Sequence, residues 1–268
     1  MNFGMFETLP IIVVFFCVVL AMLVSCEVGY QLGKHFQTRK DRYAMISLGP
    51  MVVGLLGMLA FVLAFTFSMA ASHHNLRKTY VIDEANVVGT AYLRADLLQM
   101  QYKKEVKRLL RKYVDIRLQA VVDIRLKGVS GTHFDAAFSN SIEIHQLLWT
   151  QVSTAAAKAP SLNTSLMIKS INNVIEMNEK RVTAGLHNRI PSSIWIAVLV
   201  ICILTMITMG IQIGLTGKRR LIAVIPLSMA FAALFVLVVD LDRPQTGLIM
   251  VGQQAMINLQ SNMDRESN

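Results

Sequence analysis

The chain has 268 residues, of which 54% are hydrophobic and 16% charged, and its formal net charge is +9. In a soluble protein this basic excess would suggest nucleic acid, but no basic motif with interleaved aromatic residues accompanies it, so we expect no nucleic-acid partner. The hydrophobic fraction indicates instead a protein of the lipid bilayer, in which basic residues flank the spans and meet anionic head groups.

Four stretches without Lys, Arg, Asp or Glu are long enough to cross a bilayer, namely 8–26, 43–72, 190–217 and 221–239. A spanning helix needs about 20 mostly apolar residues. We therefore predict four transmembrane helices and a multi-pass protein of the inner membrane, with the lipid bilayer as a partner. Residues 23–26 (Leu-Val-Ser-Cys) also look like a lipoprotein cleavage box, but no Lys or Arg precedes them, whereas a signal peptide begins with positive charge.

The hydrophilic block between the second and third stretches reads as helical throughout, because it contains no alternating strand pattern. From 106 to 124, apolar side chains recur at spacings of three and four, which is typical of an amphipathic helix. Pro160 followed by Ser161 is expected to end one helix and to cap the next. We predict an all-α fold divided into two spans (1–72), a soluble helical domain (73–189), two further spans (190–239) and a tail (240–268).

No Gly or Pro separates the second predicted span from the helical pattern after it, which predicts one helix from about 54 to 98. Steps of three and four along this helix stay on one face. In the membrane half, the face is small or aromatic before it becomes polar, and it consists of Gly54, Met58, Phe61, Phe65, Ser68 and Ser72. Beyond this point every position is polar, as in Asn75, Thr79, Asp83, Asn86, Thr90 and Arg94.

Two interpretations of this face are open. If several copies surround one axis, Phe61 and Phe65 form apolar rings that gate by dewetting, and the polar positions line a wet vestibule. Alternatively, the small residues only let helices approach closely, and the polar positions are the solvated face of an amphipathic helix. The apolar face of that helix would then hold Val81, Ala85, Val88 and Tyr92.

Other polar residues are candidates for chemistry. His73 and His74 point about 100° apart on a helix and cannot chelate a metal together without a third ligand, so we expect no metal site and no cofactor. Glu84 is expected to pair with Arg77 or Lys78. No nucleophile elbow, phosphate loop or HExxH motif occurs, so we expect no enzymatic activity.

Two groups of motifs resemble a known family. The first is FTFSMAAS at 65–72 with DEAN at 83–86 and GTAYLR at 89–94, and the second is DLDRP at 240–244 with GLI at 247–249. They are similar to the bestrophin-like domain of bacterial integral membrane proteins, over nearly the whole chain. The pattern departs from the family at 73–75, where His-His-Asn replaces an expected Arg, aromatic residue and acid.

Asp240, Asp242 and Arg243 close the fourth span. The simplest interpretation is that they are interfacial charges, with Arg243 pairing with a neighbouring acid. The resemblance suggests instead a structural lock against Arg94 or the loops, and it marks Glu84 as a motif residue of the same family.

Bestrophins are pentameric anion channels with four spans per subunit and a hydrophobic neck on the second span. The resemblance therefore implies a homo-oligomeric ion channel, pentameric in the family, that conducts inorganic anions such as chloride past Phe61 and Phe65. The family's calcium clasp is not recognisable here. The alternative is a non-conducting membrane scaffold or sensor, whose helical domain binds a partner through its basic helix.

Overall fold

The computed structural model describes residues 9–39, 48–127, 131–186, 188–216, 221–243 and 247–266, with side chains for all of these except 37–39, 126, 127, 131–138, 186 and 221. In this part of the chain every regular element is helical, which confirms the predicted all-α class. The helices are α1 (Ile11–Arg39), α2 (Gly49–Arg94), η2 (Ala95–Leu97), α3 (Met100–Lys127), α4 (Gly131–Lys158), α5 (Leu162–Leu186), α6 (Ser192–Thr216), α7 (Leu221–Asp242) and α8 (Gln254–Arg265).

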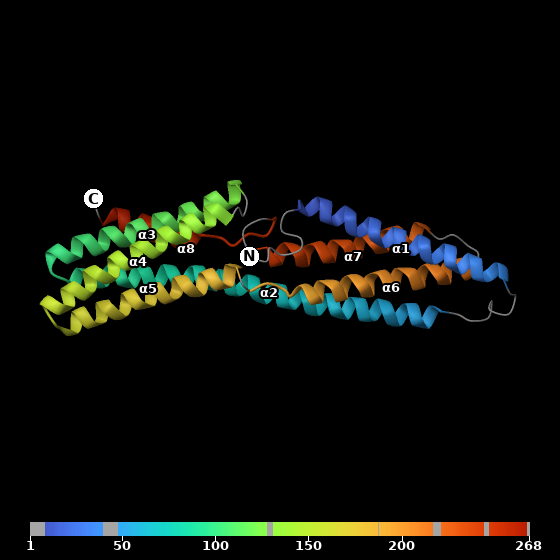
Figure 1. Cartoon of the computed structure of the whole chain (residues 1–268), viewed down its shortest axis with the longest axis horizontal. Coiled ribbons are helices and arrows are strands. Elements are labelled where there is room, and N and C mark those ends of the chain that lie inside the picture. Colours follow the sequence, from blue (N-terminus) through green and yellow to red (C-terminus); the bar gives the residue numbers. More distant parts are fainter. Residues whose placement is uncertain are drawn as a thin grey trace. The chain divides into compact units, whose positions relative to one another are not determined.

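The chain divides into two compact units, and α2 contributes to both. Unit 1 comprises Met1–His73 and Arg189–Arg243, and unit 2 comprises His74–Asn188 and Pro244–Asn268. In Figure 1, α1, α6 and α7 belong to unit 1, whereas α3, α4, α5 and α8 belong to unit 2. The predicted single helix from about 54 to 98 is confirmed, because α2 runs unbroken to Arg94 and a short 3-10 turn follows it.

Four described helices are long and apolar enough to cross a membrane, judged by length and composition alone. They cover Ile11–Phe36, Gly49–Leu97, Ser192–Thr216 and Ile222–Asp242. Each overlaps one of the four charge-free stretches of the sequence. The second helix is much longer than a bilayer needs. Its apolar part ends near Ser72, and polar residues make up the rest of the α2 face that follows.

In unit 1, α1 packs along α6 through two pairs of glycines with the spacing Gly-x-x-x-Gly. A Cβ atom on Gly33 would lie 2.5 Å from the backbone oxygen of Ile211, and one on Gly214 would lie 2.5 Å from that of Tyr30. Gly29 and Gly210 approach the opposite backbone even more closely. Small residues at this spacing let membrane helices touch along their backbones, so these glycines set the distance between α1 and α6.

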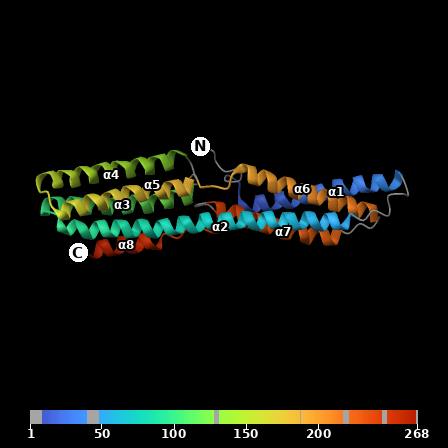
Figure 2. The same ribbon diagram turned by 90° about the horizontal axis from the view of Figure 1, so that it is seen from below.

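In unit 2, the second half of α2 packs with α3, α4 and α5, and α8 contacts α3. Figure 2 shows α8 beside this half of α2, where Leu259 lies next to Gly89. The core is apolar, and its fully buried side chains include Val88, Val106, Leu110, Leu148, Ile171, Val174 and Met256. The apolar face that the sequence predicts for this part of α2 is confirmed, because Val81, Ala85, Val88 and Tyr92 all lie in this core.

The predicted cap between α4 and α5 is also confirmed. The backbone N–H of Thr164 donates to the Ser161 hydroxyl at 3.2 Å, and the backbone N–H of Ser161 donates to the Thr164 hydroxyl at 3.0 Å. This reciprocal pair satisfies amide groups that the first turn of a helix would otherwise leave without acceptors.

The glycine contact predicts a position-specific effect of added methyl groups. Gly210→Ala should destabilise the full-length protein by roughly 1–3 kcal/mol, because the new methyl group must push α1 away from α6. The measurement is thermal unfolding in detergent in a Trp149→Phe background, followed by the fluorescence of Trp195, which lies in α6.

Gly57→Ala is the matched control, since a Cβ atom there meets nothing within 4 Å in the chain. Alanine is also a better helix former than glycine, so this variant should be neutral or slightly stabilising. Equal losses of stability in both variants would contradict the assignment of Gly210 to a helix contact.

Candidate functional site

The membrane half of the predicted face of α2, together with its polar continuation, is called the α2 stripe below. In unit 1 its members are all exposed in the single chain: Gly54, Met58, Phe61, Phe65, Ser68 and Ser72. The two phenylalanines are 73% and 61% exposed. The opposite side of the helix is buried within the unit at Leu59, Leu63, Thr66 and Ala70. Unit 1 therefore covers one side of α2 and leaves the α2 stripe uncovered.

The α2 stripe continues in unit 2 with the same helical register. Asn86 and Thr90 are exposed there, and Asp83 and Arg94 are half-buried. The guanidinium of Arg94 donates to the Ser170 hydroxyl of α5 at 2.8 Å, which holds this cation against the helix bundle. The side chain of Asp83 has no such hydrogen bond to a described residue. The α2 stripe thus carries one acid and one base in each chain.

Glu84 is the next residue after Asp83, but its side chain is fully buried in unit 2. Its carboxylate forms an ion pair with Arg117 of α3 at 3.0 Å and another with Arg181 of α5. The hydroxyl of Tyr113 donates to the same carboxylate at 2.5 Å. The expected pairing of Glu84 with Arg77 or Lys78 is therefore wrong, because its partners come from two other helices.

Arg77 makes a different contact. Its guanidinium donates to the backbone oxygens of Ala184 at 3.1 Å and Asn188 at 2.9 Å, at the end of α5. Arg77 thus provides donors for carbonyl groups at a helix C-terminus, where a cation is also favoured by the helix dipole.

The group around Glu84, called the Glu84 cluster below, extends to further polar side chains. Arg181 also donates to the Gln253 side chain at 2.6 Å, and the Tyr113 hydroxyl lies 3.3 Å from the Asn178 oxygen. The ring of His145 packs against the Tyr113 ring, with centroids 5.2 Å apart. Because two arginines surround one carboxylate, the Glu84 cluster carries a surplus of positive charge.

Burial and charge shift the pKa values of Glu84 and His145, two titratable groups of the Glu84 cluster. Burial alone would raise the pKa of Glu84, but Arg117, Arg181 and the Tyr113 hydroxyl outweigh it and lower that pKa below its ordinary 4.5. The pKa of His145 falls from its ordinary 6.5 to about 4, first because the ring is buried and second because Arg117 repels a proton there. His145 is therefore neutral at pH 7.

The arginines of the Glu84 cluster were not identified from the sequence, although a signal existed. Arg117 follows Leu110, Tyr113 and Val114 at the spacing of the apolar face of α3, and Arg181 follows Ile171 and Val174 in the same way on α5. A charged residue at an apolar position of a helix must find a partner inside the fold. Two such arginines on different helices require a shared acid.

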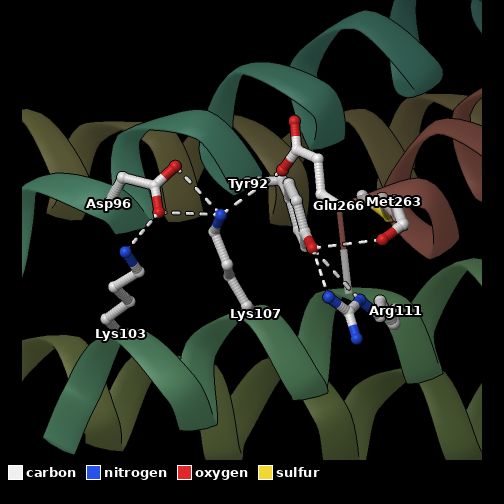
Figure 3. Close-up of polar contacts among 7 residues, drawn as sticks. All are labelled: Tyr92, Asp96, Lys103, Lys107, Arg111, Met263 and Glu266. Atoms are coloured by element: carbon white, nitrogen blue, oxygen red, sulfur yellow. Dashed lines mark hydrogen bonds and ion pairs between the residues drawn. The ribbon is translucent and has the colours of Figure 1, made fainter. Parts of the chain in front are cut away.

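A second polar group joins α8 to the rest of unit 2 (Figure 3). The Lys107 ammonium lies over the face of the Tyr92 ring, 4.4 Å from the ring centroid. The Tyr92 hydroxyl donates to the backbone oxygen of Met263 at 3.4 Å. Arg111 donates to the same hydroxyl at 3.1 Å, and Lys107 forms an ion pair with Asp96 at 2.7 Å. These contacts occupy part of the basic face of α3 within the chain itself.

Asp240, Asp242 and Arg243 are buried in unit 1. The Asp242 carboxylate accepts a hydrogen bond from the backbone N–H of Ile190 at 3.1 Å, and Arg243 donates to the backbone oxygen of Leu9 at 2.7 Å. The end of α7 is thereby tied to the segments that precede α6 and α1. Among the described residues, no group of three or more His, Cys, Asp or Glu side chains could hold a metal ion.

The low pKa of His145 predicts an acid-dependent loss of stability in unit 2. Between pH 6.5 and pH 4 the unfolded chain binds a proton at His145 that the folded chain does not, so the free energy of unfolding falls as the pH falls. The loss attributable to this group is at most about 3 kcal/mol. Below pH 4.5, Glu84 adds to this loss of stability. The unfolded chain binds a proton at Glu84 there, whereas the lowered pKa keeps the carboxylate of the folded chain ionised.

The test compares the chain with its His145→Phe variant, which keeps a ring against Tyr113 but cannot titrate. In a Trp195→Phe background, Trp149 of α4 is the remaining tryptophan and reports urea unfolding of unit 2. The variant should lose most of the slope between pH 6.5 and pH 4. An unchanged slope would show that another group causes the acid sensitivity.

Comparison with known proteins identifies the family and the fold of this chain. Residues 18–256 match the bestrophin-like domain. No curated protein matches the chain. The fold is similar to that of two variants of a bacterial bestrophin homologue from Klebsiella pneumoniae. One is 14% identical with a TM-score of 0.66, over 96% of this chain and 99% of that one. The other is 14% identical with a TM-score of 0.67, over 96% and 98% of the two chains.

A third structure, described as that of a membrane protein, is 15% identical with a TM-score of 0.66, over 96% of this chain and 98% of the other. At these identities the structural likeness shows the fold alone. The domain match, in contrast, covers most of the sequence and confirms the resemblance of the sequence motifs. The chain therefore belongs to the bestrophin-like domain family.

Proposed function

We propose that the chain is one subunit of a homo-oligomeric ion channel of the inner membrane, and that α2 lines the path. The observation that carries this proposal is the exposure of the entire membrane half of the α2 stripe, while the opposite side of the same helix is buried. In this proposal α1, the first part of α2, α6 and α7 cross the bilayer, and residues 73–189 form the soluble domain between the second and third spans.

A path requires several copies, because one helix face cannot enclose water. Closed rotational symmetry brings identical faces together around an axis without any additional sequence. Phe61 and Phe65 then form apolar rings, called the neck below, which gate by dewetting. Ser68 and Ser72 meet water or protein in this arrangement, as polar side chains at membrane depth need to do. The family resemblance suggests five subunits.

The family resemblance also supports anions, chloride among them, as the conducted ions. No chemistry beyond conduction is proposed, because the α2 stripe contains neither a nucleophile paired with a base nor a metal-binding group. The interfacial residues Asp240, Asp242 and Arg243 have a structural role in this proposal, since their described contacts tie α7 to neighbouring segments.

The alternative is a scaffold or sensor that binds a partner through the basic face of α3. Several cations of that face are already engaged within the chain. Lys103 and Lys107 bind Asp96, Arg108 binds Glu105 at 2.6 Å, and Arg111 binds Tyr92. Since surface ion pairs are weak, these contacts do not prevent α3 from binding a partner. They leave fewer free positive charges on α3 than the sequence suggests.

Ion flux into liposomes tests the proposal. Phe61→Ala combined with Phe65→Ala should increase the passive flux of chloride or potassium at least several-fold over the wild type, because the trimmed neck stays hydrated. The measurement uses the purified full-length protein in liposomes, with an ion-sensitive electrode outside.

Phe67→Ala is the matched control. It removes the same side chain from the same helix, at a position about 200° around the axis from Phe65, where the residue is 41% exposed. This variant should behave as the wild type does. Background flux in all three samples would favour the scaffold.

A further inference from the structure

The two neighbouring acids of α2, Asp83 and Glu84, have opposite environments. Glu84 points into unit 2 and is neutralised by Arg117 and Arg181. Asp83 lies about 100° around the helix on the α2 stripe, and it is half-exposed. Among the described residues it has neither a hydrogen bond nor an ion pair. The cation that senses its charge is Lys180, whose ammonium is bound to Glu176 at 2.6 Å.

The charges of the Glu84 cluster do not cancel one another. Glu84 offsets one of the two arginines of the Glu84 cluster, which leaves that cluster with a surplus positive charge. Lys180 and Glu176 form a neutral pair beside them. Asp83 adds a negative charge at the preceding residue of α2, on the half-exposed side that belongs to the α2 stripe.

The other charge of the α2 stripe, Arg94, lies too far along the helix to cancel Asp83. At about 1.5 Å per residue, the two Cα positions are about 16 Å apart along the axis. Exposed charges are screened over about 8 Å at physiological ionic strength. Of these two, Asp83 is also the one closer in sequence to the neck. An ion next to Asp83 thus senses the charge of Asp83 more strongly than that of Arg94.

We infer that Asp83 sets the sign of the charge that a permeating ion meets beside the Glu84 cluster, and that it restrains the passage of anions. This inference rests on the proposed function, because it requires the α2 stripe to face the path. A ring of Asp83 carboxylates repels chloride and opposes the surplus positive charge of the Glu84 cluster. Without that ring, each subunit presents a surplus positive charge, and the same region attracts anions.

The experiment measures the ratio of chloride to potassium permeability from reversal potentials in planar bilayers. All variants are made in the Phe61→Ala, Phe65→Ala background, in which the proposed function predicts measurable conduction. Asp83→Asn should raise the ratio by about threefold to tenfold, at the lower end of the effects of focused fields on local ion concentration. The substitution is isosteric and removes no described contact, so the fold should be retained.

Two further variants make the result specific. Glu143→Gln removes one negative charge from an exposed position of α4, away from the α2 stripe, and should leave the ratio unchanged. Asn86→Asp adds a carboxylate to the α2 stripe one turn after Asp83 and should lower the ratio. These opposite effects on one face would not follow from a change in net charge alone.

The possible outcomes separate this inference from the proposed function. Conduction with the same ratio in Asp83→Asn and its parent would overturn the inference and leave the channel proposal intact. An equal shift in Glu143→Gln would also overturn it, because the position of the charge would then be irrelevant. Absence of conduction in every sample, the trimmed neck included, would overturn the channel proposal and the inference with it.

Discussion

The burial of Glu84 between two guanidinium groups is the constraint on which unit 2 and the orientation of α2 depend. A carboxylate in an apolar core is costly unless it is paired, and here α3 and α5 each supply one arginine. Since both arginines contact the Glu84 carboxylate, they fix which side of this part of α2 faces the core of unit 2. Within unit 2, this contact leaves Asn86 and Thr90 on the exposed side of the helix.

Unit 1 reaches its packing by different physics. Between hydrocarbon-facing helices, apolar burial provides little net drive, and close backbone contact has to replace it. The glycines of α1 and α6 allow such contact over two helical turns. In unit 2 a buried ion pair lies within an apolar core, whereas in unit 1 glycines allow two helix backbones to touch. In both units a few polar or small residues determine how the helices contact one another, and apolar side chains pack around these contacts.

The sequence was most informative where the signal is local. Charge-free stretches and three-four periodicity predicted the helices, and Pro160 with Ser161 predicted a cap, because each depends on neighbours within a few turns. The partners of Glu84 could not be predicted in this way, since Arg117 and Arg181 are distant in the chain and only the fold brings them together. The close contacts of Gly29 and Gly210 with the opposite helix were missed for a related reason. Each Gly-x-x-x-Gly motif can be seen in the sequence, but the sequence does not show which helix it packs against. Residues 254–265 were treated as part of a tail, although they form α8, whose apolar side is short.

The position of α8 has a consequence for biogenesis. Met256 and Met263 are part of the core of unit 2, and Tyr92 of α2 donates a hydrogen bond to the backbone oxygen of Met263. Between these two parts of one core, the chain runs through α6 and α7. A ribosome therefore synthesises most of the bundle, then both of these apolar helices, and only afterwards the segment that completes the bundle. Until that segment emerges, the core of unit 2 lacks Met256 and Met263, so the bundle reaches its full packing only after α6 and α7 have been made.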